Sequence, residues 1–448
     1  MIWLIVFYTF SLQAILRCLY FWQLKEYRLD RFREFLSTRE SSQYFLPTRW
    51  FLRPKLTVKV VGLTLINLII LTLLINLNPV GDLSAYLAAY LLIPLIAALT
   101  VASLMPFTAI GAAIIIKLAQ QKLKRLSHNL TVIGITGSYG KTATKTILAH
   151  LLAAKYSVLS TSGTINTPIG VAQTILRQLT PSHKFFIVEM GAYKKGEIAA
   201  ICNLVRPKVG ILTGITPQHL GLFGSFDNLK EAKFELLASL PESGLAIVNG
   251  VNYDSRVLGE KLKSSAVKYY LNPKKAYDTN LIGDWQQLNI AGAVMAAKHF
   301  GISDKLIRQR LLVVPGFVTG LKQQPGLNGA LVVDSTYNAN PTGFEALIDY
   351  SLKLKKANKI LVTSGIIELG EVFEETHRRL GAKADKVFDQ IIVTKKDLIG
   401  VFGSKARYMP PTPKLLNWLK GNLNDQTAIV LISRLPKFII KALWQNQS

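Results

Sequence analysis

The sequence predicts an α/β protein. It begins with transmembrane helices, continues with a P-loop-type domain built on a mostly parallel sheet, and ends in a smaller Rossmann-like α/β domain. Two observations predict this order. Long apolar runs are confined to the residues before about position 120, in a chain of 448 residues that is 50% apolar. After residue 130, short β-branched runs alternate with helical stretches, which is typical of a mostly parallel sheet with helices on both faces.

Three apolar runs predict membrane spans, at residues 2–22, 57–77 and 85–104. Each approaches or reaches the roughly 20 residues that a spanning helix needs. The first run lacks the basic start and the small-residue cleavage site of a signal peptide, so we interpret it as a retained anchor. Residues 105–118 are too short to span. We expect them to form an interfacial or re-entrant helix that leads into a basic stalk, with the membrane region ending at residue 126.

The positions of the basic residues predict the orientation. Lys and Arg are frequent in residues 25–55, absent from the turn at 78–82 and frequent again in 117–125. The positive-inside rule therefore predicts a multi-pass protein of the inner (cytoplasmic) membrane, with both α/β domains in the cytoplasm. The net charge of +26 is explained by membrane lipids as partners. No nucleic acid is expected, because no zinc-finger spacing or RNA-binding aromatic motif accompanies the charge.

A phosphate-binding loop is predicted where an apolar run ends at Thr136. A turn of Gly137, Ser138, Tyr139 and Gly140 follows, and Lys141 and Thr142 open a helical run that reaches residue 156. Glycines let the backbone approach a phosphate, and the first amides of the helix face it. Lys141 supplies a positive charge, and the Thr142 hydroxyl can hold Mg²⁺. The strict P-loop spacing would place its first glycine at position 135, so we expect a variant loop; the alternative is an ordinary tight turn.

Two domains are expected after the membrane region, at residues 127–318 and 319–448. The first has candidate strands at 131–136, 185–190, 209–215 and 246–249 and candidate helices at 228–240 and 289–300. The second follows a Gly- and Pro-rich boundary at 315–329 and has candidate strands at 330–334, 359–363, 390–394 and 428–432.

Polar residues stand where the candidate strands end, and open α/β sheets place their ligands there. Glu189 ends an apolar run, where a carboxylate could be a Mg²⁺ ligand; the alternative is that it caps a helix. His219 follows the strand at 209–215, although a lone histidine is more often structural than a ligand. Lys233 would ordinarily be a solvated charge on a helix, and its spacing gives no other indication.

Together these segments resemble the Mur ligases, ATP-dependent amide-forming enzymes of peptidoglycan synthesis, and most of all the MurF branch. The matching segments are Thr136–Thr142, Asn166–Gly170, Glu189–Ala192, Gly196–Ile198, His219–Ser225, Ala232–Glu235, Asp334–Pro341 and Glu368–Gly370 with His377 and Gly381. The likeness extends over roughly residues 130 to 395.

The resemblance implies an ATP-dependent ligase that works through an acyl phosphate and joins a muramoyl-peptide to D-Ala-D-Ala. It implies catalytic roles for Lys141, His219 and Lys233, with Lys233 carbamylated by CO₂. Mg²⁺ would be held by Thr142 and Glu189, and His219 would help to place a second ion. Nucleotide contacts are implied for Gly137 to Thr142, Asn289 and Asp334, and substrate contacts for Asn166, Thr167, Tyr337, Asn338 and Asn340.

The sequence also departs from the family pattern. The adenine-proximal Gly-x-His-Asn-x-x-Asn motif stands here as Gly283–Asn289 with Trp285 and Gln286 in place of His and Asn, and Thr319-Gly320 replaces an expected Gly-Arg. The family's UDP-binding N-terminal domain is replaced by the membrane region. The muramoyl-peptide is therefore either UDP-linked or lipid-linked. The lipid-linked account predicts activity on lipid-linked precursor in detergent and little on the UDP-linked form.

Two alternative functions stay open. One is an amide ligase with a different amine substrate, against which the Asp334–Pro341 and Glu368–Gly370 segments argue. The other is a non-catalytic membrane scaffold that keeps the fold, against which the full set of Lys141, Thr142, Glu189, His219 and Lys233 argues.

Overall fold

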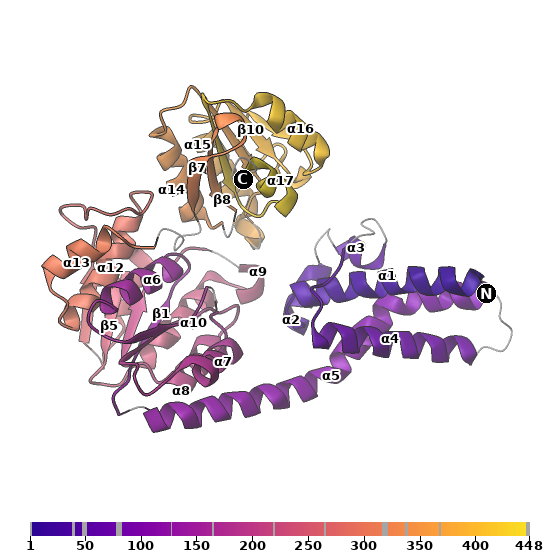
Figure 1. The fold of residues 1–448 in the computed structure, drawn as a ribbon, viewed down its shortest axis with the longest axis horizontal. Helices are drawn as coiled ribbons and strands as arrows, with labels where there is room; N and C mark the ends of the chain where they lie inside the picture. The colour runs from indigo at the N-terminus through magenta and orange to yellow at the C-terminus, as the bar shows by residue number, and fades with distance from the viewer. Residues whose placement is uncertain are drawn as a thin grey trace. The chain divides into compact units, whose positions relative to one another are not determined.

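The structure, a computed structural model, describes residues 2–37, 41–46, 52–77, 83–126, 128–163, 165–217, 220–263, 266–315, 321–336, 339–366 and 369–444. The chain divides into two units, Met1–Ile114 and Ile115–Ser448, and each is described by itself. Their elements are labelled in Figure 1. Of the predicted site residues, His219, Tyr337 and Asn338 lie outside the described residues, as do Thr319, Gly320 and Glu368.

The first unit is helical. Its long helices are α1 (Ile2–Leu24), α4 (Val58–Asn76) and the first part of α5 (Leu83–Leu126), and two short helices, α2 (Leu29–Leu36) and α3 (Ser42–Phe45), lie between α1 and α4 in the chain. Among the described residues, α1, α4 and α5 are the helices that are long and apolar enough to cross a membrane. Their packed faces share one apolar core with α2 and α3.

Helix α5 differs from the expectation of a separate helix after the third apolar run. It is one continuous helix of 44 residues with Pro94 and Pro106 inside it. A proline removes a single backbone hydrogen bond, and the Leu- and Ala-rich sequence on both sides favours continuation of the helix. At 1.5 Å per residue, α5 is about 66 Å long, roughly twice the thickness of a bilayer's hydrocarbon core. An interfacial location for residues 105–118 stays a prediction.

The second unit contains a six-stranded, wholly parallel sheet with the order β2-β3-β1-β4-β5-β6. Its strands are β1 (Thr131–Thr136), β2 (Val158–Ser160), β3 (Phe185–Glu189), β4 (Val209–Leu212), β5 (Leu245–Asn249) and β6 (Ala266–Tyr270). The associated helices are α6 (Lys141–Leu152), α7 (Pro168–Gln178), α8 (Glu197–Val205), α9 (Leu220–Phe223), α10 (Phe226–Ala238), α11 (Tyr253–Glu260), α12 (Gln286–His299) and α13 (Asp304–Leu311).

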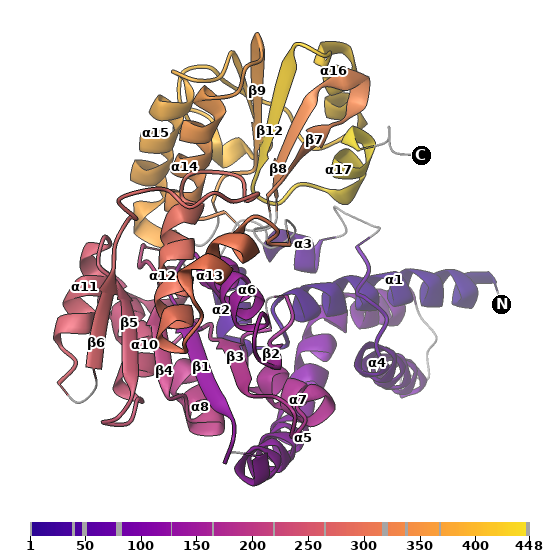
Figure 2. The ribbon, with the colours of Figure 1, turned by 60° about the vertical axis from the view of Figure 1, so that its left-hand side comes forward.

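Both faces of this sheet are covered, as Figure 2 shows. Side chains from α6, α12 and α13 pack on one face, where Ile133 and Ile135 of β1 lie. Side chains from α7, α8, α10 and the end of α5 pack on the other face, against Val132 of β1. Strands buried on both faces need near-continuous apolar runs, which is why β1 and β3 could be predicted from the sequence.

A second six-stranded sheet follows, with the order β11-β10-β9-β12-β8-β7. Its strands are β7 (Lys322–Pro325), β8 (Leu331–Ser335), β9 (Asn358–Thr363), β10 (Gln390–Val393), β11 (Ala406–Tyr408) and β12 (Thr427–Ile432), with helices α14 (Pro341–Leu352), α15 (Phe373–Ala384), α16 (Pro413–Asn422) and α17 (Lys437–Leu443). Only β7 is antiparallel to its neighbour within the described residues. Apolar clusters cover both faces. The predicted α/β class, with a second sheet after the first, is confirmed.

Candidate functional site

The loop after β1 has the backbone that a phosphate cradle requires. Gly137 and Gly140 have φ of +146° and +78°, a region that side chains rarely adopt. A Cβ on Gly140 would overlap the side-chain oxygen of Asn289. The loop therefore approaches α12 so closely that only glycine fits, and the predicted nucleotide residue Asn289 lies against it.

The segment after β4 braces this loop. The Ser138 amide donates to the carbonyl of Gly214 over 2.8 Å, and the Ser138 hydroxyl donates to the carbonyl of Thr216 over 3.0 Å. The Thr213 hydroxyl donates to the carbonyl of Thr136 over 3.0 Å. The loop is thus held at both its strand side and its turn, which fixes the direction of the amides at the start of α6.

The Lys141 ammonium lies inside the loop. Its Nζ donates to the carbonyls of Gly137 at 2.7 Å and Ser138 at 3.3 Å. Burial lowers the pKa of Lys141, an effect that the charge of Glu189 opposes. A phosphate bound at the loop would replace these carbonyls as the partner of the ammonium.

Glu189, at the end of β3, is buried beside the start of α6. Its Oε2 accepts hydrogen bonds from the Thr142 hydroxyl at 2.9 Å and from the Lys145 ammonium at 3.0 Å. Lys145 also donates to the carbonyl of Gly163. The other carboxylate oxygen, Oε1, forms no hydrogen bond within the described part of the chain. Lys145 is absent from the predicted set, although it lies three residues after Thr142 and thus on the same face of the helix.

This donor set suits Mg²⁺ only together with a nucleotide. The described residues contain no group of three or more His, Cys, Asp and Glu that could hold a metal by itself. Mg²⁺ is commonly bound by one or two protein ligands, substrate phosphates and water. The free Glu189 Oε1 and the Thr142 hydroxyl, next to a phosphate loop, fit that mode of binding.

Lys233, on α10, is a buried lysine rather than a solvated one. Its side chain is 5% exposed, and its Nζ lies 5.8 Å from the centroid of the Phe223 ring. Burial lowers its pKa to about 7, the charge of Lys141 adds to this effect, and Glu197 and Glu235 oppose it. The structure therefore places a partly neutral amine within electrostatic reach of the loop lysine.

The two predicted substrate residues at the start of α7 lie beside the end of β3. The Gly191 amide donates to the carbonyl of Asn166 over 3.1 Å, and the Asn166 side chain would contact a Cβ on Gly191 at 2.7 Å. Thr167 caps α7, since its hydroxyl accepts from the amide of Gly170. The Thr167 side chain therefore has a structural role as well as a predicted functional one.

At the start of α12, one of the two residues that depart from the family motif, Gln286, bonds to Asn289, which agrees with it. The amide nitrogen of the Asn289 side chain donates to Oε1 of the buried Gln286 over 3.0 Å. Trp285 packs edge-on against Tyr350 with the ring centroids 5.9 Å apart. Gln286 thus orients Asn289 toward the loop.

In the second sheet, Asp334 stands at the end of β8. Its Oδ1 accepts from the amide and the hydroxyl of Thr336, at 2.9 and 2.7 Å. Asn340 caps α14, with its side-chain oxygen accepting from the amide of Gly343 over 2.8 Å. His377 is wholly buried, and its Nε2 accepts from the amide of Ile366 over 2.9 Å, which is a structural role.

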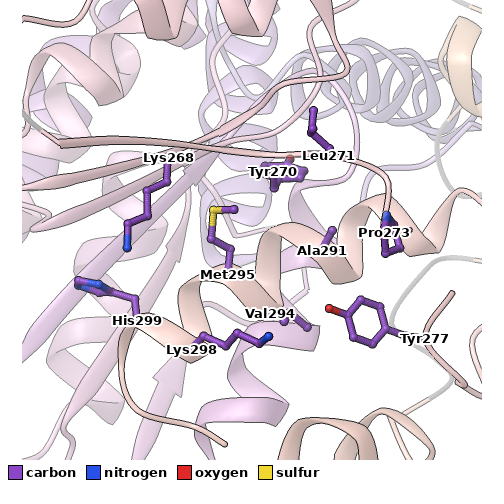
Figure 3. A pocket seen from close by; sticks show the side chains of 10 residues that line it. All are labelled: Lys268, Tyr270, Leu271, Pro273, Tyr277, Ala291, Val294, Met295, Lys298 and His299. Carbon is purple, nitrogen blue, oxygen red and sulfur yellow. The ribbon is translucent and has the colours of Figure 1, made fainter. Parts of the chain in front are cut away.

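A pocket of about 470 Å³ lies between β6 and the outer face of α12. Figure 3 shows Lys268 and His299 at one end of it and Tyr277 and Pro273 at the other. None of the predicted site residues that the structure describes lines this pocket. It is therefore separate from the phosphate loop.

Comparisons with known proteins agree with this geometry. Residues 135–305 match the family described as the Mur ligase middle domain. The chain is 29% identical over 322 residues to the UDP-N-acetylmuramoyl-tripeptide--D-alanyl-D-alanine ligase of Synechocystis sp., covering 67% of this chain and 70% of that protein. It is 27% identical over 354 residues to the ligase of the same name from Escherichia coli, covering 70% and 77%.

Solved structures of MurF ligases are also similar to this chain. MurF from Thermotoga maritima, in complex with ADP, is 26% identical with a TM-score of 0.59, covering 74% of this chain and 82% of that one. MurF from Acinetobacter baumannii shares the fold, with a TM-score of 0.67 at 24% identity and coverage of 75% and 81%. Residues 135–305, which surround the phosphate loop, therefore match a Mur ligase middle domain, and the chain is similar to MurF ligases over about two thirds of its length.

Proposed function

We propose that this protein is an ATP-dependent peptide ligase that adds D-Ala-D-Ala to a muramoyl-peptide through an acyl phosphate. The observation that carries the proposal is the placement of the buried Glu189 at 2.9 Å from Thr142, directly beside the glycine loop. A phosphate cradle with a metal-binding carboxylate is what phosphoryl transfer to a substrate carboxylate needs. The relatives named above carry this activity in their names.

Each residue of the loop has a proposed task. The amides of Gly137 to Thr142 and the Lys141 ammonium hold the β- and γ-phosphates of ATP, and Asn289 and Asp334 contact the rest of the nucleotide. Thr142 and Glu189 hold Mg²⁺, and His219 assists with a second ion. When bound, Mg²⁺ offsets the negative charge of the transferred phosphoryl group. Lys145 keeps Glu189 Oε2 engaged, so that Oε1 would be available to the ion.

Lys233 is proposed to react with CO₂. Its pKa of about 7 leaves a substantial fraction of the amine neutral at physiological pH. The neutral Nζ can form a bond to the carbon of CO₂, and one proton of the nitrogen is released to solvent. The product is an anionic carbamate close to the positive charge of Lys141, which favours it electrostatically. Support comes from burial, since a solvated lysine would stay protonated.

The substrates are proposed to bind on the side of the sheets where the phosphate loop lies. Asn166 and Thr167 would contact the muramoyl-peptide, and Tyr337, Asn338 and Asn340 the incoming amine. Because Thr167 and Asn340 already cap helices, we expect their backbone or free lone pairs to make these contacts. We propose a central domain at 127–318 and a C-terminal domain at 319–448.

Membrane attachment is proposed for the N-terminal region, residues 1–126. Its α1, α4 and α5 have the length and composition of spans, and the basic segments beside them favour a cytoplasmic location for the catalytic domains. The protein would then be a multi-pass protein of the inner membrane whose ligase reaction takes place at the cytoplasmic face.

The test is ATP hydrolysis and product mass measured with the full-length protein in detergent. UDP-linked and lipid-linked muramoyl-peptides are each supplied with and without D-Ala-D-Ala. We expect ADP formation and a peptide product that depend on D-Ala-D-Ala, and the preferred muramoyl-peptide identifies the carrier.

Lys141→Ala should abolish turnover, while the exposed Lys155→Ala should not. Stimulation by another amine would favour a different amide ligase. No turnover with any of the amines, together with an unchanged cellular phenotype for Lys141→Ala, would favour the non-catalytic scaffold.

A further inference from the structure

Arg17 is a buried charge within the first apolar helix. Its side chain is 3% exposed, and its Nε has no hydrogen-bond partner within the described part of the chain. Ala14, Ile15, Cys18 and Leu19, its neighbours on α1, are buried and apolar. A guanidinium in such surroundings is costly unless an anion pairs with it, and ionisable residues inside membrane spans commonly mark binding sites.

Tyr44 and Cys18, the two polar groups that feel the charge of Arg17, already form hydrogen bonds with other groups. The Tyr44 hydroxyl donates to the carbonyl of Pro94 at 2.7 Å and accepts from Trp22 Nε1 at 3.2 Å. The Cys18 thiol donates to the carbonyl of Tyr44. Burial raises the pKa of Tyr44, and the nearby charge of Arg17 opposes that rise. Arg17 is thus close to Tyr44, whose hydroxyl already has two partners.

Two carboxylates that follow α1 in the chain pair with other arginines. Glu26 lies 2.8 Å from Arg31, and Asp30 lies 2.6 Å from Arg28. Among the residues that the structure describes, none forms an ion pair with Arg17. The compensating anion must therefore come from outside the described part of the unit.

The depth of Arg17 fits a lipid phosphate. Arg17 is seven residues before Leu24, the end of α1, so it lies about 10 Å from that end of the helix. The basic residues that follow Leu24 place this end at the cytoplasmic surface, where the polar headgroup layer is about 5–8 Å thick. The Arg17 backbone would thus lie only a few ångströms inside the hydrocarbon core. Long arginine side chains extend toward the interface. Trp22 and Tyr44 nearby are residue types that prefer that level of the membrane.

An aromatic cap closes this end of the unit. Phe32 of α2 stacks on Trp22 with ring centroids 3.7 Å apart, and Phe35 stacks on Phe21 at 4.9 Å. Tyr44 of α3 packs edge-on against Phe32 at 5.1 Å. We call Phe32, Phe35 and Tyr44 the aromatic cap. Because it is formed by short helices, a headgroup can enter between it and α1 without unfolding a span.

We propose that Arg17 anchors the phosphate-ester headgroup of an anionic membrane lipid between α1 and the aromatic cap. The planar guanidinium matches two phosphate oxygens at once. The lipid is either a glycerophospholipid with one phosphate or a polyprenyl lipid with a diphosphate. Only the second could also present a lipid-linked substrate, but the site does not depend on the ligase reaction.

The test uses the full-length protein in neutral detergent. Lipid affinity is measured by thermal shift and by native mass spectrometry with phosphatidate, polyprenyl diphosphate, phosphatidylcholine and inorganic diphosphate. We expect wild type to bind one or both anionic lipids and neither of the other two probes. Arg17→Met should lose at least about tenfold in affinity, the order expected for loss of a charge-assisted pair. Arg33→Met, which removes an exposed arginine of α2, should bind as wild type does.

Without lipid, Arg17→Met should unfold at the same temperature as wild type or higher, because Met fills a similar volume without an unpaired charge. A lower unfolding temperature together with unchanged lipid affinity would overturn the proposal, since Arg17 would then have an internal partner. Equal responses to phosphatidylcholine would also overturn it. If Arg17→Met does not fold, Arg17→Lys replaces it as the test. Weaker lipid binding than wild type supports the proposed site, and unchanged binding contradicts it. Comparison of phosphatidate with polyprenyl diphosphate identifies the lipid class.

Discussion

Lys145 and Glu189 form a buried ion pair with 3.0 Å between Nζ and Oε2. The two side chains are 3% and 1% exposed, so each charge depends on the other for compensation. Thr142 donates to the same oxygen. The pair joins the helix after the phosphate loop to the end of β3 and leaves Oε1 of Glu189 as the oxygen available to a cation.

Removing Lys145 should therefore destabilise the protein. In Lys145→Met, the Glu189 carboxylate stays buried with only a hydroxyl partner, and the expected loss is about 3–5 kcal/mol in the free energy of unfolding. Denaturant unfolding of the full-length protein in detergent measures it. The exposed Lys155→Met serves as the control and should change stability by less than about 0.5 kcal/mol. Adding Glu189→Gln to Lys145→Met should restore part of the loss. A loss below about 1 kcal/mol would mean that the pair is solvated.

Gly140→Ala should abolish nucleotide binding. The new Cβ would be forced against the Asn289 side chain at a φ of +78°, which displaces both the loop and Asn289. Gly301 is a matched control, because it has the same φ of +78° with nothing within 4 Å of a Cβ. Both alanine variants should lose about 1–2 kcal/mol of stability from backbone strain. Only Gly140→Ala should lose ATP affinity, measured by fluorescence titration, and a similar loss in Gly301→Ala would contradict the steric account.

The parts of the fold that sequence could predict are those with local signals. The apolar run of β1, the glycines of the loop and the start of α6 at Lys141 are consecutive in the chain, and each has its own physical reason. Strand β2 (Val158–Ser160) is too short for a recognisable run. Strand β6 is at the edge of its sheet, where Lys268 and Tyr269 interrupt the apolar pattern that buried strands require. Neither was predicted.

In the site, too, the residues with a local sequence signal could be predicted and the others could not. Glu189 and Thr142 could be proposed from motif position. The role of Lys145 depends on the packing of α6 against β3, and that of Gln286 depends on the approach of α12 to the loop. The burial of Lys233 was also not evident, because charged residues surround it in the chain. Such properties arise from tertiary contacts that no local pattern contains.

Asp334→Asn separates a structural from a nucleotide-binding role for Asp334. Asn keeps an oxygen that can accept from the amide and hydroxyl of Thr336, so the turn after β8 should persist and stability should change by less than about 1 kcal/mol. The negative charge is lost, and we expect ATP affinity or turnover to fall about tenfold or more. Thr336→Ala, which disturbs the turn but keeps the carboxylate, is the control. Equal activity of Asp334→Asn and wild type would remove Asp334 from the nucleotide site.

Lys233 should make stability and activity depend on pH in a way that a solvated lysine would not. Burial holds its pKa near 7 in the folded state, against about 10.4 in the unfolded chain. Between these values the unfolded state binds one proton more, so the stability of the wild type rises with pH by up to about 1.4 kcal/mol per unit from this residue. Below pH 7 both states are protonated, and the full cost of the buried charge applies.

The stability advantage of Lys233→Met over wild type should therefore be largest at or below pH 7 and should shrink as the pH rises to 9. Denaturant unfolding in bicarbonate-free buffer measures it. Lys230 lies on the same helix, and a hydrogen bond to Asp227 raises its pKa, so Lys230→Met should show no such trend. Because only the neutral amine reacts with CO₂, bicarbonate should stimulate wild-type ATP turnover more strongly above pH 7 than below it. A stability difference that is constant from pH 6 to 9 would mean that Lys233 keeps an ordinary pKa, and carbamylation would then lose its physical basis.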